Sequence, residues 1–457
     1  MILEIADLGA IKKMKLDLSK NFILFCGPNS TGKTYASYIL NAFLSDGSII
    51  RQNYFDDIIK EIKEKGEFNL SKNYIDDCLL NTCQEIKKQA GNLFGISEET
   101  KNTLFDKFEV NISYDNLDYK KSIEEDVNIT LYDNVNVIQV TKSSNSNIVK
   151  IESIKGTFQN ILQNADIRMS SIINTILTKI ALRGRTTSRM LTVERNSIYT
   201  FKTELSLSRN ALIDRIQQNI LESGKDIINI VNSSSRRYPY AVRESLRVAN
   251  DLENIQKVEG EYAYIADEIE HDLLKGKVST TKNGDVEFST LFSVDSKKLP
   301  FHLSSSIVKT MASLVIYLRH IARQGDTLIV DEPEMNFHPD VQILLAQIFA
   351  KLSNEGIHVV ISTHSDYIIR EINNMIMAGA LYSKGREKEA LTCGYDKDTQ
   401  LDKNSVEVIY FNPNSKTGVV ETQSLEIKDE GFEVTSIDDA IIKQNQRTDD
   451  LYDYLNE

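Results

Sequence analysis

The stretch Asn21-Phe-Ile-Leu-Phe-Cys26, followed at once by Gly27-Pro-Asn-Ser-Thr-Gly-Lys33-Thr34, decides the fold. The apolar run predicts a buried strand. The next eight residues match the phosphate-binding loop pattern G-x-x-x-x-G-K-[ST], in the position between strand and helix that this motif requires. Glycines let such a loop curl until its N–H groups and the N-terminus of the next helix face phosphate oxygens. The segment therefore predicts an α/β nucleotide-binding fold with a helix that begins near Lys33.

The residues of this loop have different expected roles. In the chemistry of the motif, Lys33 meets the β- and γ-phosphate oxygens of ATP, and Thr34 holds Mg²⁺. The other cofactor-binding positions are expected to wrap the phosphates with their backbone; these are Gly27, Asn29, Ser30, Thr31 and Gly32. ATP and Mg²⁺ are thus the predicted cofactors.

Two later segments supply candidate catalytic groups. Thr327-Leu-Ile-Val-Asp-Glu-Pro333 places two carboxylates at the end of an apolar strand. We expect Asp331 to complete the Mg²⁺ site, directly or through water, and Glu332 to orient and deprotonate the attacking water. His364 follows the next strand, at 358–361, where its side chain could reach a γ-phosphate and report its loss. This set predicts an ATPase that converts ATP and water to ADP and phosphate.

The pattern along the chain predicts how these motifs are organised. Apolar residues at 307, 311, 314, 318 and 321 predict an amphipathic helix, and strands at 327–330 and 358–361 flank a second one. Such alternation indicates a largely parallel sheet covered on both faces. We predict a split head at 1–50 and 185–440, a mainly helical inserted subdomain at 55–180, and a C-terminal helix with an acidic tail at 441–457. Asn283-Gly284 predicts a hairpin turn.

Composition excludes several classes of protein. The 457 residues carry 53 Lys+Arg against 66 Asp+Glu, a net charge of −13, which argues against a simple basic nucleic-acid coat. The four cysteines form no Cys-x-x-Cys and the histidines are scattered, so neither a disulfide framework nor a zinc site is expected. No apolar stretch approaches the ~20 residues of a membrane span, and the start does not read as a secretion signal. A cytoplasmic location is expected.

Together these motifs resemble the ATP-binding-cassette ATPases of the RecF, SMC and OLD type, in which the phosphate-binding loop and the two carboxylates lie far apart in sequence. In this resemblance Leu303-Ser-Ser-Ser306 is similar to the signature motif, which implies nucleotide contacts for Ser304, Ser305 and Ser306. Glu334 to Pro339 resembles the D-loop, and His364 the switch histidine. Glu194, with Arg195 beside it, resembles the segment that takes the place of the Q-loop.

The resemblance also implies an assembly. Two heads would sandwich two ATP molecules, each bound by the loop of one subunit and the signature of the other, so at least a head-to-head homodimer is expected. The signature here lacks the glycines of the common Leu-Ser-Gly-Gly form. Without them, the distance between its backbone and a γ-phosphate, and with it the rate of ATP hydrolysis, can differ from those of the common form.

The C-terminal part bears on the kind of partner. OLD nucleases carry a metal-binding Toprim domain after the ATPase, whereas here Asp396-Lys-Asp398 has the Asp-x-Asp spacing in a polar loop without the strand framework. No intrinsic nuclease is therefore expected. This shorter form resembles the ATPase subunits of the bacterial anti-phage systems Septu and PARIS. That resemblance implies a scaffold or regulatory subunit that controls a separate nuclease or toxin effector.

Two alternatives stay open. A DNA-repair or chromosome-handling ATPase would contact DNA through basic residues. The candidates are Arg183, Arg185 and Arg189, or Arg236, Arg237, Arg243 and Arg247. A solvated helix face paired with nearby carboxylates is the simpler explanation of such residues. The absence of a long heptad run argues against an SMC-type arm. A nucleotide-bound scaffold with negligible turnover is also compatible with the glycine-free signature.

Overall fold

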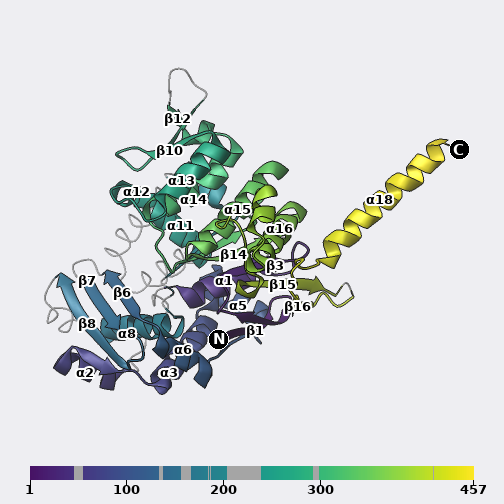
Figure 1. Cartoon of the computed structure of the whole chain (residues 1–457). Coiled ribbons are helices and arrows are strands. Elements are labelled where there is room, and N and C mark those ends of the chain that lie inside the picture. Colours follow the sequence, from purple (N-terminus) through teal and green to yellow (C-terminus); the bar gives the residue numbers. More distant parts are fainter. Residues whose placement is uncertain are drawn as a thin grey trace, which may run out of the picture.

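A nine-stranded sheet forms the centre of the molecule (Figure 1). The computed structural model describes residues 1–45, 55–132, 137–155, 166–183, 185, 187–202, 238–291, 298–414 and 416–456, and the structure is discussed for these residues. In spatial order the strands are β5 (Glu109–Ser113), β1 (Ile2–Leu8), β2 (Ile11–Asp17), β16 (Val420–Ser424), β15 (Val406–Pro413), β3 (Phe22–Cys26), β14 (His358–Thr363), β13 (Thr327–Asp331) and β9 (Ser188–Leu191).

Most neighbouring strands of this sheet run parallel. β15, β3, β14, β13 and β9 form a continuous parallel set. β16 is antiparallel to β15 and parallel to β2, and β1 pairs antiparallel with both β2 and β5. The predicted α/β fold with a mostly parallel sheet is therefore confirmed.

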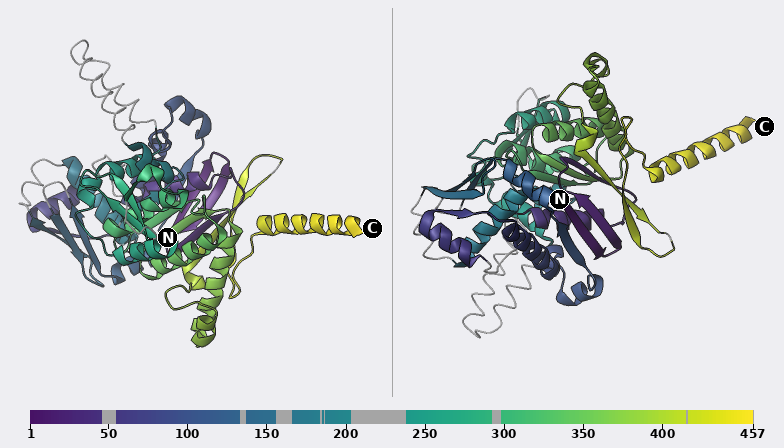
Figure 2. Two further views of the ribbon diagram at one scale, coloured as in Figure 1. Left: turned by 90° about the horizontal axis from the view of Figure 1, so that it is seen from above. Right: turned by 60° about the horizontal axis from the view of Figure 1, so that its bottom comes forward.

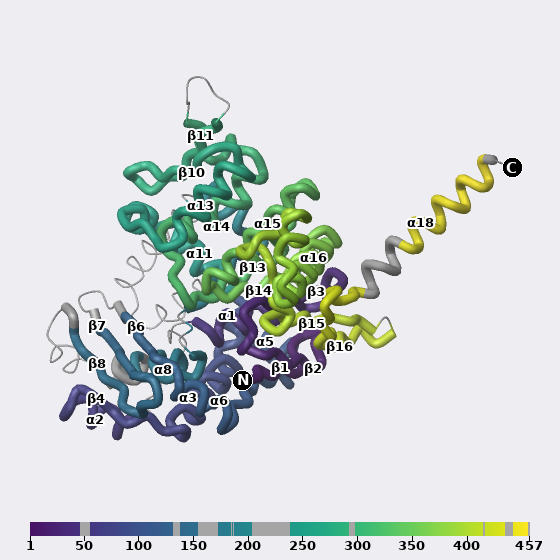
Figure 3. The backbone as a smooth tube through the Cα atoms, in the orientation of Figure 1, coloured from purple at the N-terminus to yellow at the C-terminus, as the bar shows by residue number. Residues whose placement is uncertain are grey.

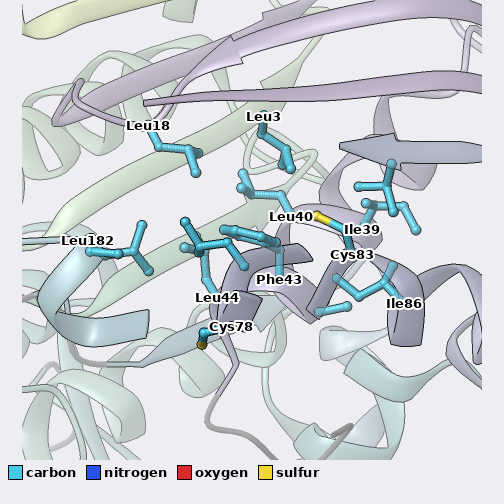
Figure 4. Packing of buried hydrophobic residues seen from close by; sticks show 14 of the residues in the cluster. Leu3, Leu18, Ile39, Leu40, Phe43, Leu44, Cys78, Cys83, Ile86 and Leu182 are labelled. Atoms are coloured by element: carbon cyan, nitrogen blue, oxygen red, sulfur yellow. The ribbon is translucent and has the colours of Figure 1, made fainter. Parts of the chain in front are cut away.

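The central strands are buried because both faces of the sheet are covered. In β3, Ile23 and Phe25 face one apolar cluster, while Phe22, Leu24 and Cys26 face another. Helix α1 (Lys33–Leu44) contributes to the first cluster, part of which is drawn in Figure 4. Helices α14 (Ser306–His320), α15 (Pro339–Asn354) and α16 (Asp366–Ser383) contribute to the second. Continuous apolar runs such as Phe22–Cys26 are what this two-sided burial requires.

The segment between α1 and β9 contains both helices and strands. Its helices are α2 (Asp56–Lys65), α3 (Lys72–Lys88), α4 (Ala90–Phe94), α5 (Glu98–Leu104), α6 (Asn116–Glu124) and α8 (Asp166–Ala181). Beside them stands an antiparallel sheet, visible in Figure 2, in the order β4 (Glu67–Asn69), β8 (Ile148–Lys155), β7 (Val137–Lys142), β6 (Val127–Tyr132). The same segment supplies β5 to the edge of the central sheet. Besides its helices, the segment 55–180 thus contains a complete small sheet.

A second group of short elements lies between residues 240 and 303, and several of them pack against α14. It comprises α11 (Tyr240–Asn250), α12 (Leu252–Ile255), α13 (Ala263–Glu268), the π-helix η1 (Ile269–Leu274), β10 (Gly276–Thr280), β11 (Val286–Thr290), β12 (Lys298–Pro300) and the 3-10 turn η2 (Phe301–Leu303). β10 and β11 form the hairpin predicted at Asn283-Gly284, and β12 completes a three-stranded sheet.

The C-terminal region ends in a projecting helix. After α17 (Glu387–Thr392), the 3-10 turn η3 (Lys403–Ser405) and the β15–β16 hairpin, α18 (Thr435–Asn456) extends away from the rest of the chain (Figure 3). The helix begins at residue 435, before the predicted boundary at 441. None of the helices in the described ranges, α18 included, is long and apolar enough to span a membrane.

Candidate nucleotide-binding site

The phosphate-binding loop joins β3 to α1 in a tightly constrained turn. Gly27 has φ 137°, and a Cβ atom there would lie 2.5 Å from the carbonyl oxygen of Phe411. Gly32, the N-cap of α1, has φ 94°. Ser30 has φ 62°, and both Asn29 and Ser30 are exposed. Only glycine fits position 27 without displacing β15, so the glycine of the motif also serves packing.

Lys33 and Thr31 are both oriented by hydrogen bonds within the loop. Lys33 is buried, and its Nζ donates hydrogen bonds to the carbonyl oxygens of Gly27 and Pro28, each at 2.8 Å. Burial lowers the pKa of Lys33, while the nearby carboxylates of Glu332 and Asp331 oppose that shift. Thr31, also buried, donates from Oγ1 to the Pro28 carbonyl at 2.9 Å. The ammonium is thus held inside the curl of the loop, where phosphate oxygens would meet it.

Asp331 lies directly beside the loop, although 297 residues separate it from Thr34. Thr34 Oγ1 donates a hydrogen bond of 2.7 Å to Asp331 Oδ2, and Ser362 Oγ donates to Asp331 Oδ1. Burial raises the pKa of Asp331, and the two hydroxyl groups partly offset that rise. Mg²⁺ prefers oxygen ligands and uses one or two carboxylates together with phosphates and waters. The hydroxyl of Thr34 and the carboxylate of Asp331 fit such an ion.

Glu332 follows in an unusual backbone conformation. Its φ is 46°, in the left-handed region that residues with a Cβ rarely adopt. Its N–H donates to the carbonyl oxygen of Ser362 at 2.9 Å. Glu332, the candidate general base, is half-buried, so part of the residue is accessible to solvent.

The buried carboxylate of Glu334 joins the segment after β13 to the segment after β14. Its Oε1 accepts hydrogen bonds from Thr363 Oγ1 at 2.6 Å and from the His364 N–H at 2.9 Å, and His364 Nδ1 lies 3.3 Å away. Within the described part of the chain its Oε2 has no hydrogen-bond partner although it is buried. The imidazole of His364 is 43 % exposed. This contact directs the Nδ1 edge of the His364 ring toward Glu334, while much of the side chain stays accessible.

Glu194 lies beyond the end of β9, at the same sheet edge as the groups described above. Its side chain is exposed, whereas the side chain of the next residue, Arg195, is buried. The Arg195 guanidinium donates to the carbonyl oxygens of Thr192 at 3.0 Å, Asp331 at 2.6 Å and Glu332 at 2.6 Å. Burial lowers the pKa of Arg195 to about 10.

The three signature serines stand apart from this group. Ser304 is buried, while Ser305 and Ser306 are exposed at the N-terminus of α14. No hydrogen bond in the described ranges joins them to the phosphate-binding loop of the same chain. In Figure 1, β12, which leads into this segment, lies at the top of the molecule and away from α1. The structure therefore brings the loop, Asp331, Glu332, His364 and Glu194 together at the carboxyl ends of the parallel strands β3, β13, β14 and β9. The three serines lie outside this group.

Comparison with protein families identifies the fold. Residues 1–369 match the family described as AAA ATPase domain. The chain belongs to the AAA ATPase domain family. Among curated proteins, no match was found.

Two solved structures are similar to this AAA ATPase at low identity. One is an SMC head bound to the C-terminal winged-helix domain of ScpA, with 14 % identity, 93 % of this chain and 97 % of that chain covered, and a TM-score of 0.33. The other is an SMC head with an extended coiled coil bound to the C-terminal domain of ScpA, derived from Pyrococcus furiosus, with 12 % identity, 97 % and 98 % covered, and a TM-score of 0.35.

The arginines considered for DNA contact have intramolecular partners where the structure describes them. In this AAA ATPase, Arg243 donates to the carbonyl and side-chain oxygens of Asn92, each at 2.9 Å, and its guanidinium lies 5.9 Å from the Tyr240 ring centroid. Arg185 is buried. Arg236 and Arg237 lie outside the described residues. The packing of Arg243 follows from local structure and gives no sign of a nucleic-acid surface.

The Asp396-x-Asp398 pair forms a turn. The Asp396 carboxylate accepts hydrogen bonds from the N–H groups of Asp398 at 3.0 Å and Thr399 at 2.9 Å. Among the described residues, no cluster of three or more His, Cys, Asp or Glu side chains could hold a metal ion. The carboxylate spacing in this loop is thus explained by turn formation.

The roles of Arg195 and Glu334 are not evident from the sequence. Each belongs to a segment with a family resemblance, but the hydrogen bonds that each makes at the centre of the site depend on the fold. Both residues are charged and follow shortly after an apolar strand. A charged side chain that is buried at such a place needs polar partners, and this pattern is the sequence signal for their roles.

Proposed function

We propose that this AAA ATPase binds ATP with Mg²⁺ in the phosphate-binding loop and hydrolyses it at the edge formed by β3, β14, β13 and β9. The observation that carries this proposal is the 2.7 Å hydrogen bond between Thr34 Oγ1 and Asp331 Oδ2. It holds side by side the two oxygens that would bind the metal, although 297 residues separate them in sequence. A bound Mg²⁺ would neutralise charge on the phosphate oxygens.

Four side chains around the metal site would bind the phosphates and activate the attacking water. Lys33 would leave its contacts with the loop carbonyls and bind β- and γ-phosphate oxygens. Glu332 would orient the attacking water and take its proton, because this residue directly follows Asp331, which would bind the metal, and is partly open to solvent. His364, at the end of the neighbouring strand, would contact the γ-phosphate. Glu194, exposed at the same edge, is the candidate for positioning water or metal from the side of β9.

Two variants test this proposal. Lys33→Ala should abolish ATP binding, because the phosphates lose their buried cation. Glu332→Gln should preserve ATP binding and reduce turnover by at least about 100-fold, since general-base catalysis contributes that much. Lys12→Ala, which removes a lysine 61 % exposed on β2, serves as the control and should change neither quantity. Normal turnover in Glu332→Gln would contradict the role of Glu332 as base.

The proposed assembly is a dimer in which the signature of one head completes the ATP site of the other. Its support is that Ser305 and Ser306 are exposed at a helix N-terminus, where free N–H groups can meet an anion, and make no contact with their own loop. ATP should convert Glu332→Gln from a monomer to a dimer in light scattering. Ser306→Arg should prevent this conversion while ATP still binds to the monomer. An ATP-independent mass would contradict the sandwich.

At the biological level, the proposed role is that of a regulatory or scaffold subunit of an anti-phage defence complex, which restrains a separate nuclease or toxin until a phage-derived trigger changes its nucleotide state. The resemblance of the motif set to such subunits supports this role, and the Asp396 turn is consistent with the nuclease belonging to another polypeptide. Co-expression with the product of the adjacent gene tests it. Co-purification together with Lys33-dependent protection from phage is expected. Absence of both would refute this role and leave the ATPase proposal standing.

A further inference from the structure

We infer that Arg195 is a positioning residue of the ATPase site, which fixes the turn that carries Glu332 so that its carboxylate stays directed at the reacting water. The inference rests on the proposed function of Glu332 as general base. Arg195 touches neither nucleotide nor metal in the scheme above. It acts through the backbone carbonyls of Asp331, which would bind the metal, and Glu332, which would orient the water.

The contacts of Arg195 are directed at this turn. The side chain is only 3 % exposed. Nη1 donates to the carbonyl oxygen of Asp331 at 2.6 Å and Nη2 to that of Glu332 at 2.6 Å, so the two ends of the guanidinium hold two consecutive peptide units. In the described part of the chain it forms no ion pair. A planar guanidinium can hold two carbonyls in this fixed geometry, whereas a lysine ammonium is a single point donor.

The turn that Arg195 holds is intrinsically unfavourable. Glu332 adopts φ 46°, which costs free energy in a residue with a Cβ and persists only where the surroundings enforce it. Three hydrogen bonds hold it here. The Glu332 N–H donates to the Ser362 carbonyl at 2.9 Å, and the Glu332 carbonyl accepts from Arg195 Nη2 at 2.6 Å and from the Met335 N–H at 3.2 Å. Without the guanidinium, the Glu332 carbonyl keeps only the longer of its two hydrogen bonds, and the turn that carries the Glu332 side chain is held less tightly.

Charge strengthens the same arrangement. The carboxylates of Asp331, Glu334, Glu332 and Glu194 all lie close enough to Arg195 to favour its charged form. Its positive charge therefore compensates a strongly acidic edge of the sheet while all its hydrogen bonds go to carbonyl oxygens. Losing it should affect the position of Glu332 more than the binding of ATP, because Lys33 and the loop N–H groups, which bind the phosphates, do not contact Arg195.

The experiment compares Arg195→Met, Arg195→Lys and a matched control, Arg185→Met. Arg185 is also buried, at 4 % exposure, and donates from Nη2 to the Lys20 carbonyl at 2.7 Å, but it does not contact the turn. Turnover, KM and MgATP affinity are measured on the full chain, alone and in the Glu332→Gln background. Amide hydrogen exchange of residues 328–337 reports whether the turn is released.

We expect Arg195→Met to lower kcat by about 100-fold, the effect of misplacing a catalytic group by about 1 Å, with KM nearly unchanged. Arg195→Lys should recover only part of this loss, Arg185→Met should leave kcat unchanged, and exchange at 328–337 should rise in the Arg195 variants alone. In the Glu332→Gln background, Arg195→Met should cause almost no further loss, because both changes disable the same group.

Other outcomes overturn specific statements. Equal kcat losses in Arg195→Met and Arg185→Met, or an undiminished further loss in the Glu332→Gln background, would overturn the positioning role. Normal turnover in Glu332→Gln would instead overturn the proposed function of Glu332. If Arg195→Met does not fold, Arg195→Lys with unchanged kcat and unchanged exchange at 328–337 would overturn the inference by itself.

Discussion

Glu407 should make the stability of this protein depend on pH, and the magnitude follows from its surroundings. The side chain is 9 % exposed in β15, between β16 and β3, and its Oε2 accepts the N–H of Asp17 at 2.8 Å. Burial raises the pKa of Glu407 to about 7 from its ordinary 4.5, with the nearby Asp17 carboxylate also raising it, while the Asp17 N–H and Lys20 oppose the rise.

The sign follows from linkage. The folded state holds the Glu407 proton more tightly than the unfolded chain does, so this group stabilises the fold most at low pH and loses that contribution as the pH rises toward and through 7. One pKa unit corresponds to about 1.4 kcal/mol. With pKa values of 4.5 unfolded and about 7 folded, the unfolding free energy should fall by about 2.5 kcal/mol between about pH 5 and pH 8 from this group alone.

Glu407→Gln isolates this contribution, because glutamine keeps an oxygen that can accept the Asp17 N–H and has no proton to lose. Urea unfolding followed by circular dichroism at several pH values should show the variant gaining about 2.5 kcal/mol on the wild type between about pH 5 and pH 8. Glu421→Gln, which changes an exposed carboxylate on β16, should show no such trend. A difference between Glu407→Gln and wild type that stays constant over this range would refute the reasoning.

Three further predictions concern the site. Thr34→Val should raise the Mg²⁺ concentration for half-maximal turnover by about tenfold, because it removes an oxygen ligand and a hydrogen bond to a carboxylate. Thr34→Ser keeps the hydroxyl and should not raise it, which a magnesium titration of both variants tests. Glu334→Gln should lower kcat by about tenfold with KM unchanged, because it weakens the hold on His364, and a parallel rise in KM in steady-state kinetics would contradict this. Gly27→Ala should weaken nucleotide binding by about 100-fold in a fluorescence titration. Its control, Gly394→Ala, has φ 89° but open space around the new Cβ and should bind normally.

Much of the fold was predictable because its signals are local. The run Phe22–Cys26 is buried on both sides, as an apolar strand in a parallel sheet must be, and the loop after it carries its own backbone requirements in Gly27 and Gly32. The helix at 306–320 was predictable from its 3.6-residue period. In each of these cases a short window of sequence contains the whole physical reason.

The segment after α1 shows where such reasoning fails. Its strands are short and lie between Lys- and Glu-rich helices, so their pairing depends on partners elsewhere in the segment: β4 pairs with β8, about 80 residues further along the chain. β5 pairs with β1 at the edge of the central sheet, which no local pattern could indicate. An isolated strand has no hydrogen-bond partner, so its position in a sheet is determined by strands that are distant in sequence.

The site itself is a consequence of strand order. β14 lies between β3 and β13, so the hydroxyl of Thr34 and the carboxylate of Asp331 meet across the end of an intervening strand. Ser362, on that intervening strand, donates to the other carboxylate oxygen of Asp331, and its carbonyl receives the N–H of Glu332. Because side chains alternate along a strand, a slip of β14 by one residue would turn Ser362 to the opposite face and remove the carboxylate contact. The pairing that stabilises the sheet is therefore also what sets the geometry of the candidate catalytic groups.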